Sequence, residues 1–198
     1  TLTHTSGLAG SQIFSGSLAA AVDELAQRPL AFQPGSRWQY GPGLNVAGRI
    51  VEVVSEQPLA DFLEQRIFMP LGVTNTTFTP AEEQQLRIAT IYAPGDDRRS
   101  LVTAENHITD FSNVTGPNPS GGLVSSARDM FRFYQMVLDK GWLRDRRVLS
   151  VAAIEQMTSP QTGDLETGFT PGNCWGLGWC IVREQQGVTG MLSPDTFG

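Results

Sequence analysis

Residues 34–55 read PGSRWQYGPGLNVAGRIVEVVS, and they are the most informative stretch of the chain. Two proline–glycine pairs, Pro34-Gly35 and Pro42-Gly43, enclose Tyr40, and an apolar helix pattern starts at the second pair. Proline fixes its own φ and glycine permits positive φ, so such pairs are typical of turns. The stretch predicts a stiff loop that holds Tyr40 just before the N-terminal end of a packed helix. The phenol either packs on the core or faces a cleft as part of a proton relay.

Composition limits the classes of protein to which the chain can belong. It has 198 residues, of which 40% are hydrophobic and 17% charged, which suits one large domain or part of a larger one. The net charge is −6, and Lys140 is the only lysine among 14 basic residues. Since no basic stripe occurs, we expect no nucleic-acid partner. No apolar run approaches the roughly 20 residues that span a bilayer, so we expect no transmembrane segment.

Helical patterns dominate the chain. Serine precedes several of them at the position where its hydroxyl caps the first turn, and Pro58 stands at the first turn of another. Apolar residues then recur at helical spacing. The predicted helices cover 15–27, 43–55, 58–72, 125–141 and 150–160.

Strand patterns are few and short. Residues 88–94 and 99–104 predict a hairpin, and 173–184 predict a single strand, while 105–124 form a long irregular loop. Two or three short strands do not complete a sheet. The sequence therefore predicts an α+β fold, mostly helical, with a few short antiparallel strands and an incomplete central sheet. We expect residues 1–198 to be a single partial domain, the middle part of a larger one.

The cysteines and histidines do not predict a metal or a disulfide. Cys174 and Cys180 lie about 20 Å apart if 173–184 is one strand, whereas a disulfide needs Cα atoms within about 7 Å. We expect both to be small core residues on one strand face. His4 and His107 have no ligand spacing with each other or with the cysteines, so we expect neither metal nor cofactor. His4 is expected to fix a turn through local hydrogen bonds.

Familiar catalytic motifs are missing. The chain has no G-x-S-x-G motif and no phosphate-binding loop. It has no S-x-x-K either, because the residue three positions before its only lysine, Lys140, is Val137. Tyr40 remains as a candidate catalytic residue. A phenol titrates near ~10 and needs a nearby cation to act as a base at neutral pH. Arg37 is close in sequence, although residues three apart in a turn need not meet.

Six stretches occur in an order and at spacings that give the chain a family resemblance. They are LTHTSGL (2–8), PLAFQPGSRWQYGPGLNVAGRIVEVVS (29–55), FLEQRIFMPLGVTNTTF (62–78), PSGGLVSSARDMFRFYQMVLDKG (119–141), RVLSVAAIEQM (147–157) and WGLGW (175–179). With these stretches the chain resembles the serine β-lactamase and penicillin-binding-protein superfamily, especially its class C-like branch of esterases and related hydrolases. The resemblance implies the β-lactamase/transpeptidase-like fold.

The resemblance implies acyl transfer through a covalent acyl-enzyme. Members use serine and lysine in S-x-x-K, tyrosine in Y-x-N, and a K-T-G or H-x-G strand; only the tyrosine maps here, onto Tyr40. The resemblance thus implies a fragment of a serine hydrolase, inactive in isolation, with Tyr40 as proton relay. Its parent would act on a small-molecule ester or amide in a bacterial periplasm or outside the cell. Pro42 replaces the asparagine of Y-x-N, which favours esters over β-lactams.

The resemblance also suggests which residues bind substrate. Asn113 and Asn118 of the long loop, and Trp175 of the predicted strand, are candidates for lining the cleft. An alternative stays open: a non-catalytic module of the same fold, in which the 105–124 loop holds a peptide or glycan without turnover. The oligomeric state does not follow from the sequence.

Overall fold

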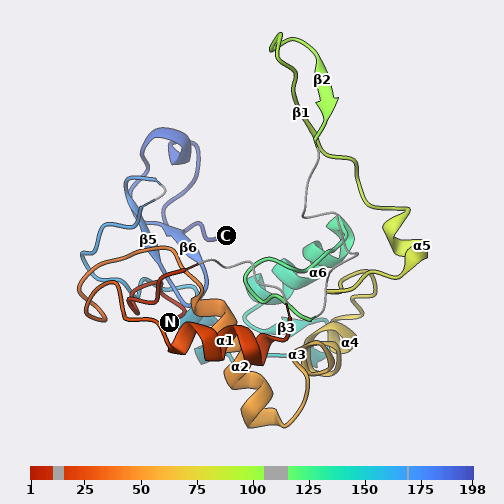
Figure 1. Cartoon of the computed structure of the whole chain (residues 1–198), viewed down its shortest axis with the longest axis horizontal. Coiled ribbons are helices and arrows are strands. Elements are labelled where there is room, and N and C mark those ends of the chain that lie inside the picture. Colours follow the sequence, from red (N-terminus) through yellow and green to blue (C-terminus); the bar gives the residue numbers. More distant parts are fainter. Residues whose placement is uncertain (11–15, 105–115, 169) are drawn as a thin grey trace.

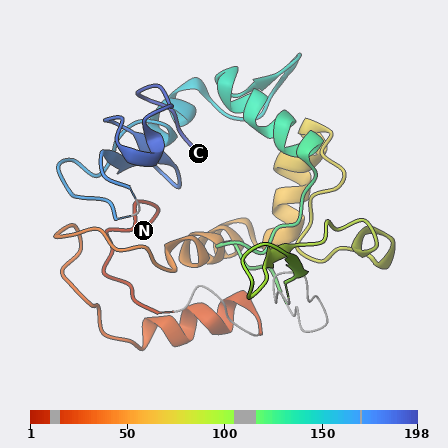
Figure 2. The same cartoon turned by 90° about the horizontal axis from the view of Figure 1, so that it is seen from above.

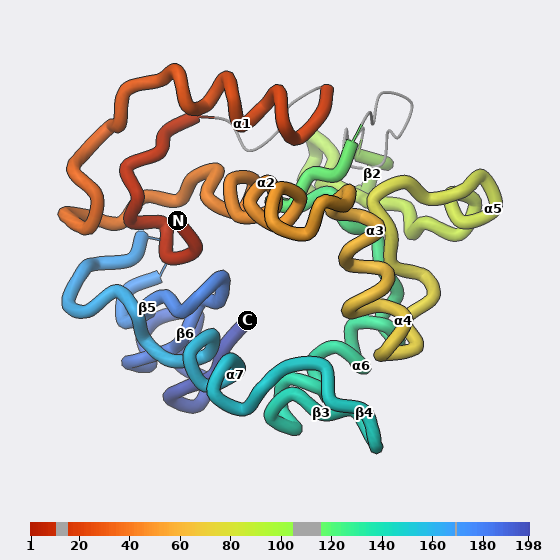
Figure 3. Tube along the Cα trace, turned by 90° about the horizontal axis from the view of Figure 1, so that it is seen from below, coloured from red at the N-terminus to blue at the C-terminus, as the bar shows by residue number. Residues whose placement is uncertain are grey.

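The computed structural model describes residues 1–10, 16–104, 116–168 and 170–198. The chain follows a ring-like course, in which the helices and hairpins succeed one another around a centre (Figures 2 and 3). One hairpin, β1 (Tyr92–Pro94) with β2 (Leu101–Thr103), projects away from this ring (Figure 1). The two ends of the chain lie beside a second hairpin, formed by β5 (Asn173–Trp175) and β6 (Cys180–Val182), where Leu2 and Gly198 hydrogen bond to residues 178–180.

The first two helices confirm the sequence prediction. In α1 (Leu18–Ala26), the Ser17 hydroxyl accepts a hydrogen bond from the Ala20 N–H and caps the helix. Helix α2 (Gly43–Ser55) begins directly after Pro42, whose buried ring and carbonyl form the start of the first turn. The second proline–glycine pair of the opening stretch therefore starts a helix as well as ending a loop.

The predicted helix over 58–72 has a widened turn in its middle. It divides into α3 (Leu59–Leu63), the π-helical η1 (Glu64–Phe68) and α4 (Met69–Leu71), and ends at Gly72 with φ 63°. Proline at position 70 has no N–H to donate, and its ring crowds the carbonyl one turn earlier. A turn with wider spacing just before it relieves that crowding. Gly72 then provides the left-handed residue that ends the helix.

The later helices also begin at serine caps. Ser126 accepts a hydrogen bond from the Asp129 N–H at the start of α6 (Ala127–Leu138). Ser150 accepts one from the Ala153 N–H at the start of α7 (Val151–Met157). Three short elements were not predicted: α5 (Glu82–Gln85), the hairpin of β3 (Trp142–Leu143) with β4 (Arg146–Arg147), and the 3₁₀ turn η3 (Gly187–Thr189).

Asp129 joins α6 to the chain that follows α4. Its side chain is buried, and the carboxylate oxygen Oδ2 accepts hydrogen bonds from the N–H groups of Thr74 and Asn75, at 3.2 and 2.6 Å. The Thr76 hydroxyl donates to the same oxygen at 3.2 Å. The carboxylate also lies in the first turn of α6, where the helix dipole favours negative charge. Asp129 therefore fixes the packing of residues 74–76 on the start of α6.

The predicted strand over 173–184 is wrong, because the chain turns back on itself. It forms an antiparallel hairpin of β5 (Asn173–Trp175) and β6 (Cys180–Val182), with Trp175 opposite Cys180. Gly178, at φ 83°, allows the tight turn, which the Gly176 N–H closes by donating to the Trp179 carbonyl. In CWGLGWC, tryptophan and leucine alternate with cysteine and glycine, as large and small residues do along one strand, so the sequence pattern did not indicate the turn.

The hairpin also corrects the placement of the two cysteines. Cys174 pairs with Ile181, whereas Cys180 pairs with Trp175. Since paired residues share a face and successive residues alternate, the cysteines lie on opposite faces rather than on one. Both cysteines are free thiols, as expected. They do not pair because their side chains point to opposite faces of the hairpin, and not because they are far apart along one strand.

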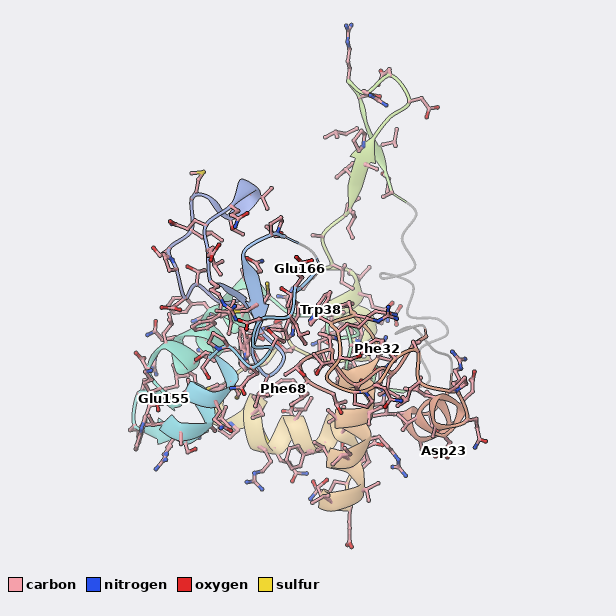
Figure 4. The ribbon with its side chains drawn as sticks, turned by 90° about the vertical axis from the view of Figure 1, so that its left-hand side faces the viewer. Asp23, Phe32, Trp38, Phe68, Glu155 and Glu166 are labelled. Carbon is pink, nitrogen blue, oxygen red and sulfur yellow. The ribbon has the colours of Figure 1, made fainter. Side chains whose placement is uncertain are left out.

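Two hydrophobic clusters hold the ring together. The larger joins α4, α6 and α7 to the core-facing side of the β5–β6 hairpin, and the smaller joins α1 to α3. In Figure 4, Phe68 lies within the packed helices, whereas Asp23 and Glu155 lie at opposite outer edges. The buried members of the larger cluster are Phe68, Leu71, Val73, Met136, Val137, Ile154, Cys174, Trp179 and Ile181; those of the smaller are Leu18, Leu59 and Phe78.

The predicted fold class is confirmed. The described residues are mostly helical where they are regular, and their strands form three separate two-stranded antiparallel ladders. Backbone hydrogen bonds from residues 196–198 add to the free edge of β6. Along the described ranges, none of the helices combines the length and apolar character that a bilayer crossing demands.

Candidate functional site

The segment 1–8 braces the loop that carries Tyr40. The carbonyls of Thr5 and Gly7 accept hydrogen bonds from the N–H groups of Gly35 and Ala31, at 2.7 and 2.8 Å. Gly7 has φ 79°, and a Cβ there would lie 2.3 Å from a backbone oxygen of the loop. This close contact between two backbones requires glycine. The loop is therefore fixed by a segment about 30 residues earlier, in addition to its own turns.

Tyr40 is partly open to solvent. Its side chain is 39% exposed, so the ring lies at the surface rather than inside the core. The phenol ring stacks on the His4 ring, with centroids 4.3 Å apart and planes inclined by 29°. Arg37 does not face it in this way, since the Arg37 guanidinium lies over the Phe32 ring at 4.6 Å. Part of the phenol therefore faces away from the packed interior of residues 1–198.

His4 and two tryptophans pack around Tyr40. Trp175 contacts the rings of His4 and Tyr40 edge-on, at 5.1 and 6.0 Å, and Trp38 lies 5.3 Å from Trp175. In Figure 4, Trp38 lies near the segment that carries Glu166. That segment approaches closely, because a Cβ on Gly168 would lie 3.0 Å from the Trp38 ring. The aromatic cluster of His4, Trp38, Tyr40 and Trp175 thus brings three distant segments together.

His4 is held in its neutral form. It is buried, and burial lowers its pKa below the ordinary value of 6.5. Its Nδ1 accepts a hydrogen bond from the Gly41 N–H at 3.2 Å, which requires an unprotonated nitrogen. The sequence predicted that the His4 side chain fixes a turn by local hydrogen bonds; the hydrogen-bond partner of its Nδ1 is instead Gly41, 37 residues away.

The lowered pKa of His4 predicts a pH-dependent stability. Below about pH 6.5 the unfolded chain gains a proton on His4 that the folded chain excludes, so the free energy of unfolding falls as pH drops and levels off below the folded-state pKa. We expect the free energy of unfolding in urea to fall less between about pH 7.5 and about pH 5.5 in His4→Asn than in the wild type. His107 is present in both proteins, so its contribution to the pH dependence cancels in the comparison. Equal losses would contradict the assignment.

The structure brings Trp175 beside Tyr40, but it gives Asn118 another immediate role. Trp175 is only 7% exposed, so it packs more than it lines an opening. The Asn118 side-chain oxygen accepts a hydrogen bond from the Ser120 N–H at 3.1 Å and shapes a local turn. Asn113 lies outside the described residues. Among the described contacts of the predicted binding residues, the one with Tyr40 is the ring contact of Trp175.

The turn that contains Asn118 docks on α2. The Ser120 hydroxyl donates to the side-chain oxygen of buried Asn45 at 2.6 Å. Gly48, one turn further along α2, leaves room for Pro119: a Cβ there would lie 2.5 Å from the proline Cγ. These contacts place the end of the long loop against the helix that Tyr40 precedes.

Sequence reasoning missed two buried polar residues around the tyrosine loop: His4, which stacks on Tyr40, and Asn45, which bonds to Ser120. Buried polar side chains are uncommon unless their hydrogen bonds are satisfied. In the sequence, only their positions within the stretches LTHTSGL and GLNVAG could have indicated that these two polar residues are buried. In the described parts of the chain, histidine, cysteine, aspartate and glutamate form no group of three or more that would suit a metal ion.

Comparisons with known proteins agree on one family. The Beta-lactamase family model matches residues 2–198. Protein Rv1367c of Mycobacterium tuberculosis is 32% identical over 219 aligned residues, covering all of this chain and 54% of the relative. Lovastatin esterase of Penicillium rubens is 34% identical over 144 residues, covering 72% of this chain and 35% of the relative. The chain spans about half the length, or less, of these curated relatives.

A solved structure supports the same fold. Simvastatin synthase from Aspergillus terreus superimposes with a TM-score of 0.70 at 23% identity, over 93% of this chain and 52% of that one. At this level of identity the likeness concerns the fold alone. The family model and the curated relatives, which include hydrolases, confirm the family resemblance seen in the six stretches, and the solved structure agrees in fold. The chain belongs to the Beta-lactamase family, within the superfamily of serine β-lactamases and penicillin-binding proteins.

Proposed function

We propose that residues 1–198 form the tyrosine-bearing part of a serine hydrolase that acts through a covalent acyl-enzyme. Tyr40 relays protons, while a serine and a lysine from sequence outside this stretch supply the nucleophile and its partner amine. The attacking serine forms an ester with the acyl group and expels the leaving group, and water then releases the acid. The isolated chain 1–198 is inactive on this proposal, because it contains no S-x-x-K.

One observation carries the proposal: the ring of Tyr40 is both partly exposed and rigidly held. A side chain that only filled the core of residues 1–198 would be buried among them, whereas Tyr40 is 39% exposed and faces away from that core. A solvated loop tyrosine would not have its ring stacked on a buried histidine at 4.3 Å. Proton transfer in a transition state needs a group held within hydrogen-bond reach of the reacting atoms. Tyr40 meets the requirement for a fixed, accessible donor and acceptor.

The proposed substrates are small esters, with amides as the second class. Pro42 stands where the family's Y-x-N motif has asparagine, and its ring is buried at the start of α2. Proline has no side-chain amide to hold the acyl amide of a β-lactam or a peptide. The likeness to lovastatin esterase, whose name denotes an ester substrate, supports the same direction.

Active-site labelling tests this proposal. We expect a fluorophosphonate probe to label the full-length protein at one serine outside residues 1–198, where the serine oxygen displaces fluoride from phosphorus. We expect no stoichiometric labelling of the separately expressed chain 1–198. Mass mapping of the labelled peptide gives the position.

Two results would contradict the proposal in different ways. Stoichiometric labelling of a serine within 1–198 would place the nucleophile in the wrong part of the protein. No labelling anywhere in a folded full-length protein would favour the non-catalytic alternative, a binding module of the same fold. Heat-unfolded protein serves as the control, because the reactivity of the serine depends on the assembled site.

A further inference from the structure

Three contacts from His4 converge on Tyr40 and its two neighbours. The His4 carbonyl accepts a hydrogen bond from the Gln39 N–H at 2.9 Å. The His4 Nδ1 accepts one from the Gly41 N–H at 3.2 Å. The imidazole ring stacks on the phenol between these two bonds, at 4.3 Å. One distant residue therefore holds the backbone on both sides of Tyr40 and the face of its ring.

His4 is itself strongly constrained. It is 4% exposed, and its backbone has φ 58°, in the left-handed region that residues with a Cβ rarely adopt. Such a conformation persists where surrounding contacts over-determine it. Trp38 and Trp175 contact the imidazole edge-on at 5.8 and 5.1 Å, and the His4 N–H donates to the Thr1 carbonyl. The imidazole is thereby confined among aromatic rings.

We propose that His4 is a positioning residue for Tyr40: it fixes the backbone on both sides of the tyrosine and the plane of the phenol, and so sets where the phenol oxygen lies. This inference rests on the proposed role of Tyr40 as proton relay. His4 acts through Tyr40 and needs no contact with the substrate. Turnover depends on such placement, since displacing a catalytic group by about 1 Å can cost on the order of 10²-fold in rate.

Two substitutions separate the contributions of His4. His4→Gly removes the imidazole and Nδ1 but accepts the positive φ without strain, so any effect is not a backbone clash. His4→Asn restores an acceptor close to the position of Nδ1 and also tolerates a left-handed backbone. Both variants keep the carbonyl that accepts from Gln39. The Gln39 amide is therefore an internal control in each protein.

The experiment measures placement and turnover separately in the full-length protein. Amide hydrogen exchange by NMR reports the hydrogen bonds of Gly41 and Gln39, and ¹³C-labelled tyrosine rings report the stacking of Tyr40. Steady-state kinetics on p-nitrophenyl acetate gives kcat and KM. A thermal melt confirms that each variant folds.

For His4→Gly we expect a fall in kcat of about tenfold or more, a KM within about twofold, loss of Gly41 protection and a shifted Tyr40 ring signal. For His4→Asn we expect recovery of Gly41 protection and of part of kcat. Unchanged Gly41 protection and kcat in a folded His4→Gly variant would overturn the proposal. So would a fall in kcat with Gly41 protection and the Tyr40 ring signal both intact.

The test distinguishes this inference from the proposed function. If Tyr40→Phe has wild-type kcat, the proton-relay role of Tyr40 fails, and a catalytic purpose for His4 fails with it. If Tyr40→Phe is impaired while His4→Gly is not, the proposed function stands and only the positioning role of His4 fails.

Discussion

Tyr40→Phe is expected to lower kcat/KM of the full-length protein for a small ester by about 10²- to 10⁴-fold, the range typical of general acid–base catalysis. The loss corresponds to about 3 to 5 kcal/mol of transition-state stabilisation. The substitution removes one oxygen and keeps the ring, so the stacking on His4 is preserved. Because an interaction made only in the transition state is lost, kcat and kcat/KM should fall together. Steady-state kinetics on p-nitrophenyl acetate measures both.

Tyr92→Phe is the matched control. Tyr92 lies on β1 of the hairpin that projects from the ring, and its side chain is 57% exposed (Figure 1). It loses the same oxygen from a place outside the aromatic cluster and should leave turnover unchanged. If Tyr40→Phe kept kcat/KM within about twofold of the wild type, Tyr40 would be a packing residue.

Asp129→Ala is expected to destabilise the folded protein by about 2 to 3 kcal/mol. The change leaves the N–H groups of Thr74 and Asn75 and the Thr76 hydroxyl without their shared acceptor. A buried donor without a partner costs about 1 to 3 kcal/mol, and the cost per donor is smaller here, because Thr74 is exposed and the Thr76 hydroxyl keeps its hydrogen bond with Ser125. The favourable charge in the first turn of α6 is lost as well. Urea unfolding of the full-length protein should show a lower midpoint with an unchanged slope.

The other end of the same helix supplies the control. Asp139 is exposed at the C-terminus of α6, where its carboxylate accepts one hydrogen bond from the Gln135 side chain. Asp139→Ala removes an equal number of atoms and is expected to change the free energy of unfolding by about 0.5 kcal/mol or less. A cost for Asp129→Ala as small as this would show that residues 74–76 find other partners at little expense.

Local signals account for the parts of the fold that were predicted. A serine followed by apolar residues at helical spacing identified α1, α6 and α7, because cap and helix lie within a few residues of each other. The turn between β5 and β6 was missed, since aromatic and small residues around two glycines also suit an extended strand. The π-helical turn before Pro70 was also missed, because a proline inside a helical pattern can end, kink or widen the helix, and the pattern does not say which.

The sequence pointed to one residue of the candidate site. Tyr40 became a candidate through its flanking proline–glycine pairs and the family resemblance. His4 and Asn45 did not, because their partners are far away in sequence: Nδ1 of His4 meets Gly41, and Asn45 meets Ser120, 75 residues on. Nothing in a local window specifies such pairs. They follow from the ring-like course of the chain, which only the three-dimensional structure reveals.

The alternation of side chains on the β5–β6 hairpin has an evolutionary consequence. Cys174 and Ile181 face the larger hydrophobic cluster, while Trp175 and Cys180 lie on the other face, from which Trp175 contacts the Tyr40 ring. Substitutions on the second face therefore alter the surroundings of the tyrosine without touching the larger cluster, but they are not free of cost, because Trp175 and Val182 are buried as well. A lineage that changes the surroundings of Tyr40 through this hairpin is expected to exchange Trp175 only for side chains of similar volume, and to keep the length of the turn.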